Sequence, residues 1–178
     1  MIGLLRFVGI LNAAVWFGAA IFLTFGAGPA VVSADIEKLL GAKNFPYFSD
    51  AISQVLWGRY FHFQVGCAIV ALLHVLSERL YLGKSPEKLW LGLLIALFTI
   101  TLLGSAWVQP KLKQLNTARY AANIRLEDRQ AAGEAFLAWR KVLQVVNIFA
   151  IGGLGIYLWH MANPADPTRF VSTNKFRS

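Results

Sequence analysis

Four long apolar runs constrain this chain more than any other feature of its sequence. They cover roughly residues 7–31, 56–77, 88–108 and 142–162. About 20 mostly apolar residues are enough for a helix to cross the hydrocarbon core of a bilayer, which is about 30 Å thick. Because lipid offers no water to bare backbone groups, runs of this length must be helical. The sequence therefore predicts an all-α integral membrane protein.

Composition supports the same class of protein. Hydrophobic residues make up 57% of the 178 residues and charged residues only 15%, whereas a soluble domain carries about 25% charged residues. A secretory signal peptide is the rival interpretation of the first run. That run is longer than the apolar core of a signal, and only Arg6 precedes it, so a retained span is favoured.

The connections between the runs predict a four-helix bundle of two antiparallel transmembrane hairpins. Gly83 and Pro86 indicate a tight turn between the second and third spans. Residues 33–54 predict an interfacial helix and turn lying on the membrane. Residues 110–141 are charged and rich in helix formers, which predicts an extramembrane helical hairpin or a helix extended beyond the third span. The transmembrane domain is expected to cover residues 1–163, followed by a polar tail over 164–178.

The net charge of +8 does not indicate a nucleic-acid partner. The basic residues lie mainly between the apolar runs, where contact with anionic headgroups explains them, and no basic face carries interleaved aromatic residues. Ten of the 17 Lys and Arg residues lie on the side of the two long connections. This leans towards placing that side in the cytoplasm and leaves the orientation open. The expected location is a cell membrane, specifically a bacterial inner membrane.

Polar residues within the spans are the best functional candidates, because buried polarity is costly in lipid. None of the deep positions is Asp, Glu, Lys or Arg, which argues against a proton-coupled transporter but not against passive conduction. Helix–helix seams and a pathway for a small solute are the two interpretations of the candidates. These candidates are Asn12, Thr101, Ser105 and Asn147.

His74 and His160 raise a haem or metal hypothesis. The second and fourth spans run in the same direction, so both imidazoles are expected towards one membrane face, and two such groups can ligate the iron of haem b. His62 lies beside aromatic residues typical of the membrane interface. The single cysteine, Cys67, lies mid-span and is expected to be inert, and it excludes an internal disulfide framework.

Three stretches resemble the transmembrane protein 205-like family of small four-span membrane proteins. These are "LWGRYFHFQVGCAIVAL" at 56–72, "AWVQPKL" at 106–112 and "FLAWRKVLQVVN" at 136–147. Two positions depart from the pattern, since Gly58 replaces its usual proline and Trp139 its usual histidine. The resemblance implies a four-helix membrane fold and no agreed catalytic or cofactor residue, since the family's activity is uncharacterised.

Catalytic motifs are absent from the sequence, including GxSxG, HExxH and the P-loop. The leading prediction is therefore a multi-pass membrane protein without catalytic activity, free-standing or an accessory subunit of a larger membrane complex. Its expected partners are the lipid bilayer and other membrane subunits or further copies of itself. A small-solute transporter or channel is the first alternative, and a haem or metal binder using His74 and His160 is the second.

Overall fold

The computed structural model describes residues 2–82 and 88–163, and the described chain is helical with no strand. The turn predicted at Gly83 and Pro86 and the tail predicted over 164–178 lie outside the described residues. The elements are α1 (Ile2–Ile21), the π-helical η1 (Phe22–Ala27), α2 (Gly28–Val31), α3 (Ala34–Leu40), α4 (Phe45–Leu82), α5 (Lys88–Leu103), the π-helical η2 (Gly104–Val108), α6 (Gln109–Tyr120) and α7 (Leu126–Ala162).

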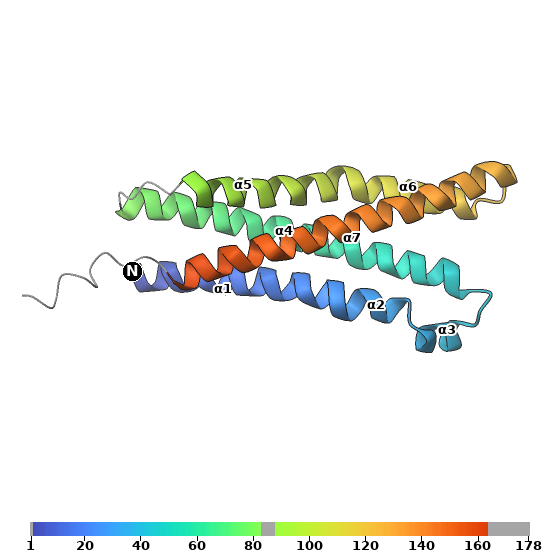
Figure 1. The fold of residues 1–178 in the computed structure, drawn as a ribbon, viewed down its shortest axis with the longest axis horizontal. Helices are drawn as coiled ribbons and strands as arrows, with labels where there is room; N and C mark the ends of the chain where they lie inside the picture. Colours follow the sequence, from blue (N-terminus) through green and yellow to red (C-terminus); the bar gives the residue numbers. More distant parts are fainter. Residues whose placement is uncertain (1, 83–87, 164–178) are drawn as a thin grey trace, which may run out of the picture.

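These elements form four long rods that lie side by side (Figure 1). The rods are Gly3–Val31, Phe45–Tyr81, Lys88–Tyr120 and Leu126–Ala162, and each is long and apolar enough to cross a membrane. The all-α fold class and the four predicted spans are thereby confirmed. The start of α1, the end of α4 and the end of α7 share one end of the molecule, and α3 lies at the other (Figure 1).

The prediction of an interfacial helix and turn over 33–54 is wrong in its extent. The short α3 covers only the first part of this stretch, with the Ser33 hydroxyl accepting from the Ile36 amide at its start and Gly41, at φ 74°, at its end. Helix α4 already begins at Phe45. Proline is tolerated in the first turn of a helix, so Pro46 starts α4 instead of forming a turn.

The second long connection is helical on both sides, as predicted. Helix α6 continues the third rod beyond η2, and α7 begins at Leu126, far before the fourth apolar run. The result combines both sequence expectations, because an extended third helix is also one arm of a helical hairpin. The extensions of α4, α6 and α7 pack around a second cluster of buried side chains formed by Phe61, Leu112, Phe136 and Leu143.

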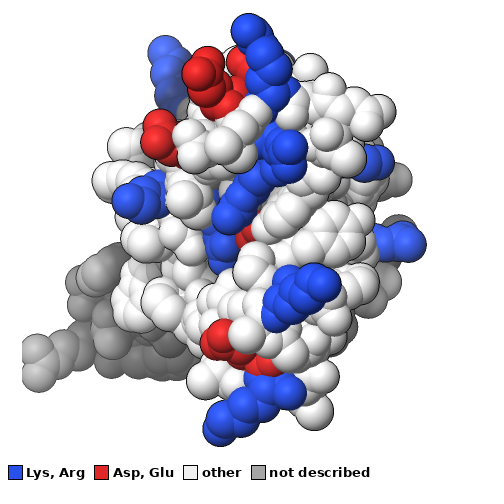
Figure 2. Space-filling model, turned by 90° about the vertical axis from the view of Figure 1, so that its right-hand side faces the viewer, with Lys and Arg blue, Asp and Glu red and all other residues white. Residues whose placement is uncertain are grey.

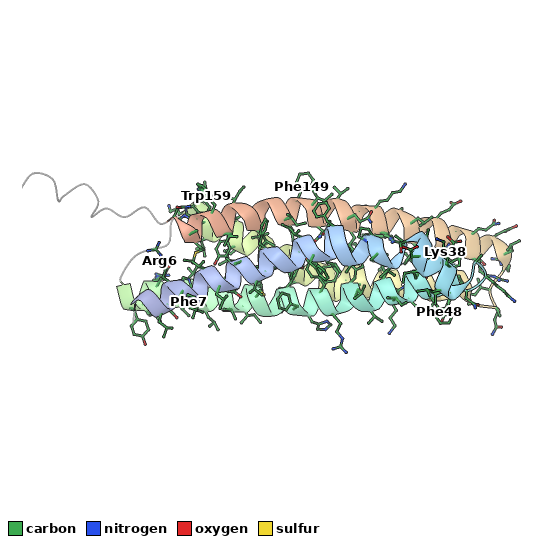
Figure 3. The ribbon with its side chains drawn as sticks, turned by 90° about the horizontal axis from the view of Figure 1, so that it is seen from below. Arg6, Phe7, Lys38, Phe48, Phe149 and Trp159 are labelled. Carbon is green, nitrogen blue, oxygen red and sulfur yellow. The ribbon has the colours of Figure 1, made fainter. Side chains whose placement is uncertain are left out.

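The main core lies between the rods and is built around a few large side chains set among small ones. Trp16, Leu94 and Leu154 are fully buried. The neighbouring alanines let the helices approach closely, as is typical of membrane bundles. The outer surface is apolar as well, with Phe149 75% and Trp159 72% exposed; both point away from the bundle in Figure 3. An apolar exterior is what a lipid solvent requires.

The charged residues divide the molecule into a membrane part and a head. Arg6, Glu78 and Lys88 lie near one end of the rods. About 20 residues inward from them, at 1.5 Å per residue, a hydrocarbon core of about 30 Å is expected to end near residues 26, 58 and 108, and near 142 on α7. We call the parts beyond this level the head, namely α2, α3, α6 and the first portions of α4 and α7. Seen end-on, the head carries scattered basic side chains and fewer acidic ones (Figure 2).

Candidate functional site

A network of buried polar side chains links three rods just inside the membrane boundary. The Tyr60 hydroxyl of α4 donates to Asn147 Oδ1 of α7 at 2.9 Å, and Gln64 Nε2 donates to the Tyr60 oxygen at 2.6 Å. Asn147 Nδ2 donates to the Thr24 hydroxyl of η1, which in turn donates to the Ala20 carbonyl. Each of these side chains therefore has its hydrogen-bonding partner within the protein.

A cluster of ionised side chains lies above this network, in the head. Asp50 of α4 accepts from Arg119 of α6 at 2.9 Å and from Arg140 of α7 at 3.4 Å. The Tyr120 hydroxyl donates to the same carboxylate at 3.2 Å. The Asp50 side chain is only 9% exposed, so this ion cluster, formed by Asp50, Arg119 and Arg140, joins three rods from a buried position.

A groove runs from the ion cluster down to the polar network. It has a volume of about 370 Å³ and lies between η1 and α2 on one side and α7 on the other, with α4 contributing the remaining wall. Figure 1 shows the end of α7 beside α1, and the rest of α7 passing over α4 and away from α2 towards the head. The lining residues are Leu23, Thr24, Phe25, Gly28, Pro29, Val32, Ser53, Leu56, Trp57, Arg140, Gln144 and Ile148.

The predicted seam residues do not converge on one site. Asn147 belongs to the polar network, whereas Asn12 Nδ2 donates to the Cys67 carbonyl at 2.9 Å across the α1–α4 seam. The Thr101 hydroxyl donates to Leu97 within its own helix, and Ser105 is half-buried on η2. Asn12 and Asn147 thus bond across helices, as a structural seam requires.

The predicted histidines pack against different helices. His74 is buried, and its Nε2 lies 3.0 Å from the Leu5 carbonyl of α1. The imidazole of His160 stacks on Trp90 of α5 with ring centroids 3.7 Å apart. The exposed His62 lies 2.6 Å from the Gly58 carbonyl of its own helix. Among the described residues, no three His, Cys, Asp or Glu side chains form a group that could hold a metal. The haem hypothesis stays a prediction.

Sequence reasoning did not find the groove or the ion cluster. Asp50 lay in a stretch interpreted as interfacial, and its two arginine partners are 69 and 90 residues away in the chain. Tyr60 was interpreted only as one of the aromatic residues at the membrane interface, and its hydrogen bond to Asn147 could not be predicted. The start signal at Pro46 was the one local feature that could have placed Asp50 on the inner face of a helix.

Comparison with known proteins identifies a family but no activity. The family model described as a domain of unknown function (DUF4149) matches residues 11–121, which run from α1 to the end of α6. No curated protein and no solved structure matches the chain. The match covers more than half of the sequence, and it includes most of the first three rods. The chain therefore belongs to the DUF4149 family.

Proposed function

We propose that this protein is a non-catalytic subunit of a larger membrane assembly. The observation that carries the proposal is that the polar network of the spans is bonded within the bundle, whereas the buried Trp16 Nε1 and Tyr157 hydroxyl have no hydrogen-bonding partner among the described residues. Tyr60, Gln64 and Asn147 bond to one another, and Asn12 bonds to the backbone of the neighbouring helix. In lipid, such bonds fix how helices pack. An enzyme active site would instead present an acid, a base or a nucleophile to a substrate in a pocket.

An exposed apolar face of the head supports an accessory role. Phe48, Ile52 and Val55 are spaced so that they share one face of α4, and they are 45%, 40% and 64% exposed. This face lies beyond the expected end of the hydrocarbon core, so lipid tails do not cover it. Exposed apolar patches of this kind are typical of protein–protein contact. A helix of another subunit, or of a second copy of the chain, fits it.

Native mass spectrometry of the protein extracted from its own membranes in mild detergent tests this proposal. We expect a discrete mass above the 19.7 kDa of the chain, because a partner covers the α4 face. Val55→Glu places a charge in that contact and is expected to release the partner. Leu137→Glu is the matched control, since Leu137 is a similarly exposed side chain on α7.

A preparation that stays at the mass of one chain and turns over a small substrate unaided would overturn the proposal. Retention of the partner by Val55→Glu would show that the face is not the contact. The visible absorption spectrum of the same material, oxidised and then reduced with dithionite, tests the haem alternative directly.

We also propose that the chain is related to the transmembrane protein 205-like family. Residues from separate resembling stretches meet in space, which supports this relationship. Tyr60 of the first stretch bonds Asn147 of the third, and Phe61 shares a buried cluster with Phe136. The location we propose is a bacterial inner membrane, because proteins that span the outer membrane are typically β-barrels.

Passive conduction is a second candidate, favoured by the groove that reaches Thr24 of the polar network. If a solute passes along this seam, Asn147→Leu is expected to abolish its uptake into vesicles, because the leucine removes both polar atoms from the path. If Asn147 is structural, the variant keeps uptake and only its free energy of unfolding falls, by about 1–2 kcal/mol, because the hydrogen bonds to Tyr60 and Thr24 are lost. Solute uptake and thermal unfolding of the same reconstituted variant separate the two roles.

A further inference from the structure

We propose that the groove between α2, α4 and α7 binds the headgroup of an anionic phospholipid, with Arg140 as the phosphate ligand. The occupant is a lipid and not a soluble anion, because the lower walls are mostly apolar, with Thr24 and Gln144 as polar exceptions. Phe25 is 68% exposed and Ile148 54% exposed at the lipid-facing side of the groove. This inference concerns lipid recognition and stands independently of the proposed role as a subunit.

Charge complementarity identifies the sign of the ligand. The ion cluster sets two guanidinium groups against one carboxylate, so it carries an excess of one positive charge. The arginine side chains are only 29% and 22% exposed, and a buried charge without a counterion is costly. Arg119 and Arg140 form no ion pair with any other acidic group of the described residues. A phosphodiester at the groove supplies the missing negative charge.

Arg140 can hold a phosphate without giving up Asp50. Of its five N–H donors, only one on Nη1 is directed to Asp50 within hydrogen-bonding distance, and this contact is long, at 3.4 Å. The residue lines the groove, so the rest of the planar fork is available to phosphate oxygens, which arginine binds in a bidentate manner. Ser53, also in the lining, is 9% exposed, and its buried hydroxyl has no hydrogen-bonding partner. It is a further polar group for the headgroup.

The depth of the groove matches the position of a lipid headgroup. Arg140 and Trp57 lie at the expected end of the hydrocarbon core, whereas Ile148 lies about 12 Å further down α7 at 1.5 Å per residue. A phosphate beside Arg140 therefore leaves the acyl chains level with Ile148, where the surface is apolar. The volume of about 370 Å³ is within the usual range of ligand pockets, about 300–1,000 Å³.

Lipid titration of the full chain, followed by native mass spectrometry, tests the proposal. We expect the purified protein to bind one phosphatidylglycerol in preference to phosphatidylcholine. Arg140→Gln is expected to weaken phosphatidylglycerol binding about 10-fold, because it removes a charge-assisted contact with phosphate. Lys141→Gln is the matched control; it removes the same charge from the adjacent, exposed position, which does not line the groove, and it is expected to bind as the parent does.

A second pair of variants keeps the test sound if Arg140→Gln fails to fold. Val32→Trp fills the groove while leaving the ion cluster intact, and it is expected to abolish the bound phosphatidylglycerol. Val145→Trp places the same side chain on an exposed position of α7 outside the groove and is expected to have no effect. Equal binding of the two lipids by the parent protein, or unchanged binding by Val32→Trp, would overturn the proposal. Displacement of the lipid by millimolar inorganic phosphate would overturn the lipid assignment in favour of a soluble anion.

Discussion

Asp50→Ala is expected to produce the largest loss of stability among single substitutions of charged residues in this protein. The change leaves Arg119 and Arg140 without their shared carboxylate, and it removes the acceptor of the Tyr120 hydroxyl. Removing one partner of a buried ion pair costs about 3–5 kcal/mol. Because the two guanidinium groups keep partial exposure, we expect the free energy of unfolding to fall by about 2–3 kcal/mol, which lowers the melting temperature by roughly 5–10 °C.

The measurement is thermal unfolding in detergent or nanodiscs, followed by circular dichroism. Asp128→Ala is the matched control, because Asp128 pairs with Arg125 in the same head but with side chains 51% and 82% exposed. Exposed pairs contribute about 0–1 kcal/mol, so the control is expected to melt close to the parent. Equal melting temperatures for both variants would contradict the structural role assigned to the ion cluster.

Gly104→Leu is expected to destabilise the junction between the membrane part and the head. A Cβ at Gly104 meets the ring of Phe61, which belongs to the buried cluster that holds the extensions of α4, α6 and α7 together. Overpacking of this kind costs about 1–3 kcal/mol. Gly152→Leu is expected to stabilise the protein instead. Nothing lies within 4 Å of the Cβ position at Gly152, and replacing a helical glycine raises the free energy of unfolding by about 0.5–1 kcal/mol.

Unfolding of the two glycine variants is followed by the same thermal assay. The specific cause of the Gly104 effect is tested by adding Phe61→Ala to Gly104→Leu. Since the leucine then occupies space that the ring has left, the double variant is expected to be more stable than the sum of the two single effects predicts. Simple additivity would mean that the clash with Phe61 is not the cause.

The sequence predicts the membrane spans and the helical extensions over 110–141 well, and the start of α4 poorly. Apolar runs identify the stretches that need lipid, because the hydrophobic pattern there is nearly continuous. In the head the same helices continue with polar residues, and hydropathy no longer follows their course. The true start of α4 at Phe45 was therefore missed, although Pro46 was a usable signal.

The candidate site depends on contacts that no local pattern encodes. Asn147 was recognised as a costly polar residue in a span, but its partners Tyr60 and Thr24 lie 87 and 123 residues away. Asp50 was not singled out within the stretch predicted as interfacial, because its partners that bury it come from α6 and α7. Likewise, the spacing of His74 and His160 along their helices could not show that one packs on α1 and the other on α5.

The two π-helical segments have a consequence for how this fold can vary. Both η1 and η2 occur near the membrane boundary, and each is followed by a proline at the start of the next helix. A π-turn holds one residue more than an α-turn, which rotates everything after it by about 100° around the helix axis. In each of these rods the buried face therefore has one rotation around the helix axis in the membrane part and another in the head. Conversion of η2 to regular α-helix without loss of a residue would turn Leu112 by about 100°, out of its cluster, whereas deletion of one residue at η2 would restore a regular helix and leave Leu112 in place.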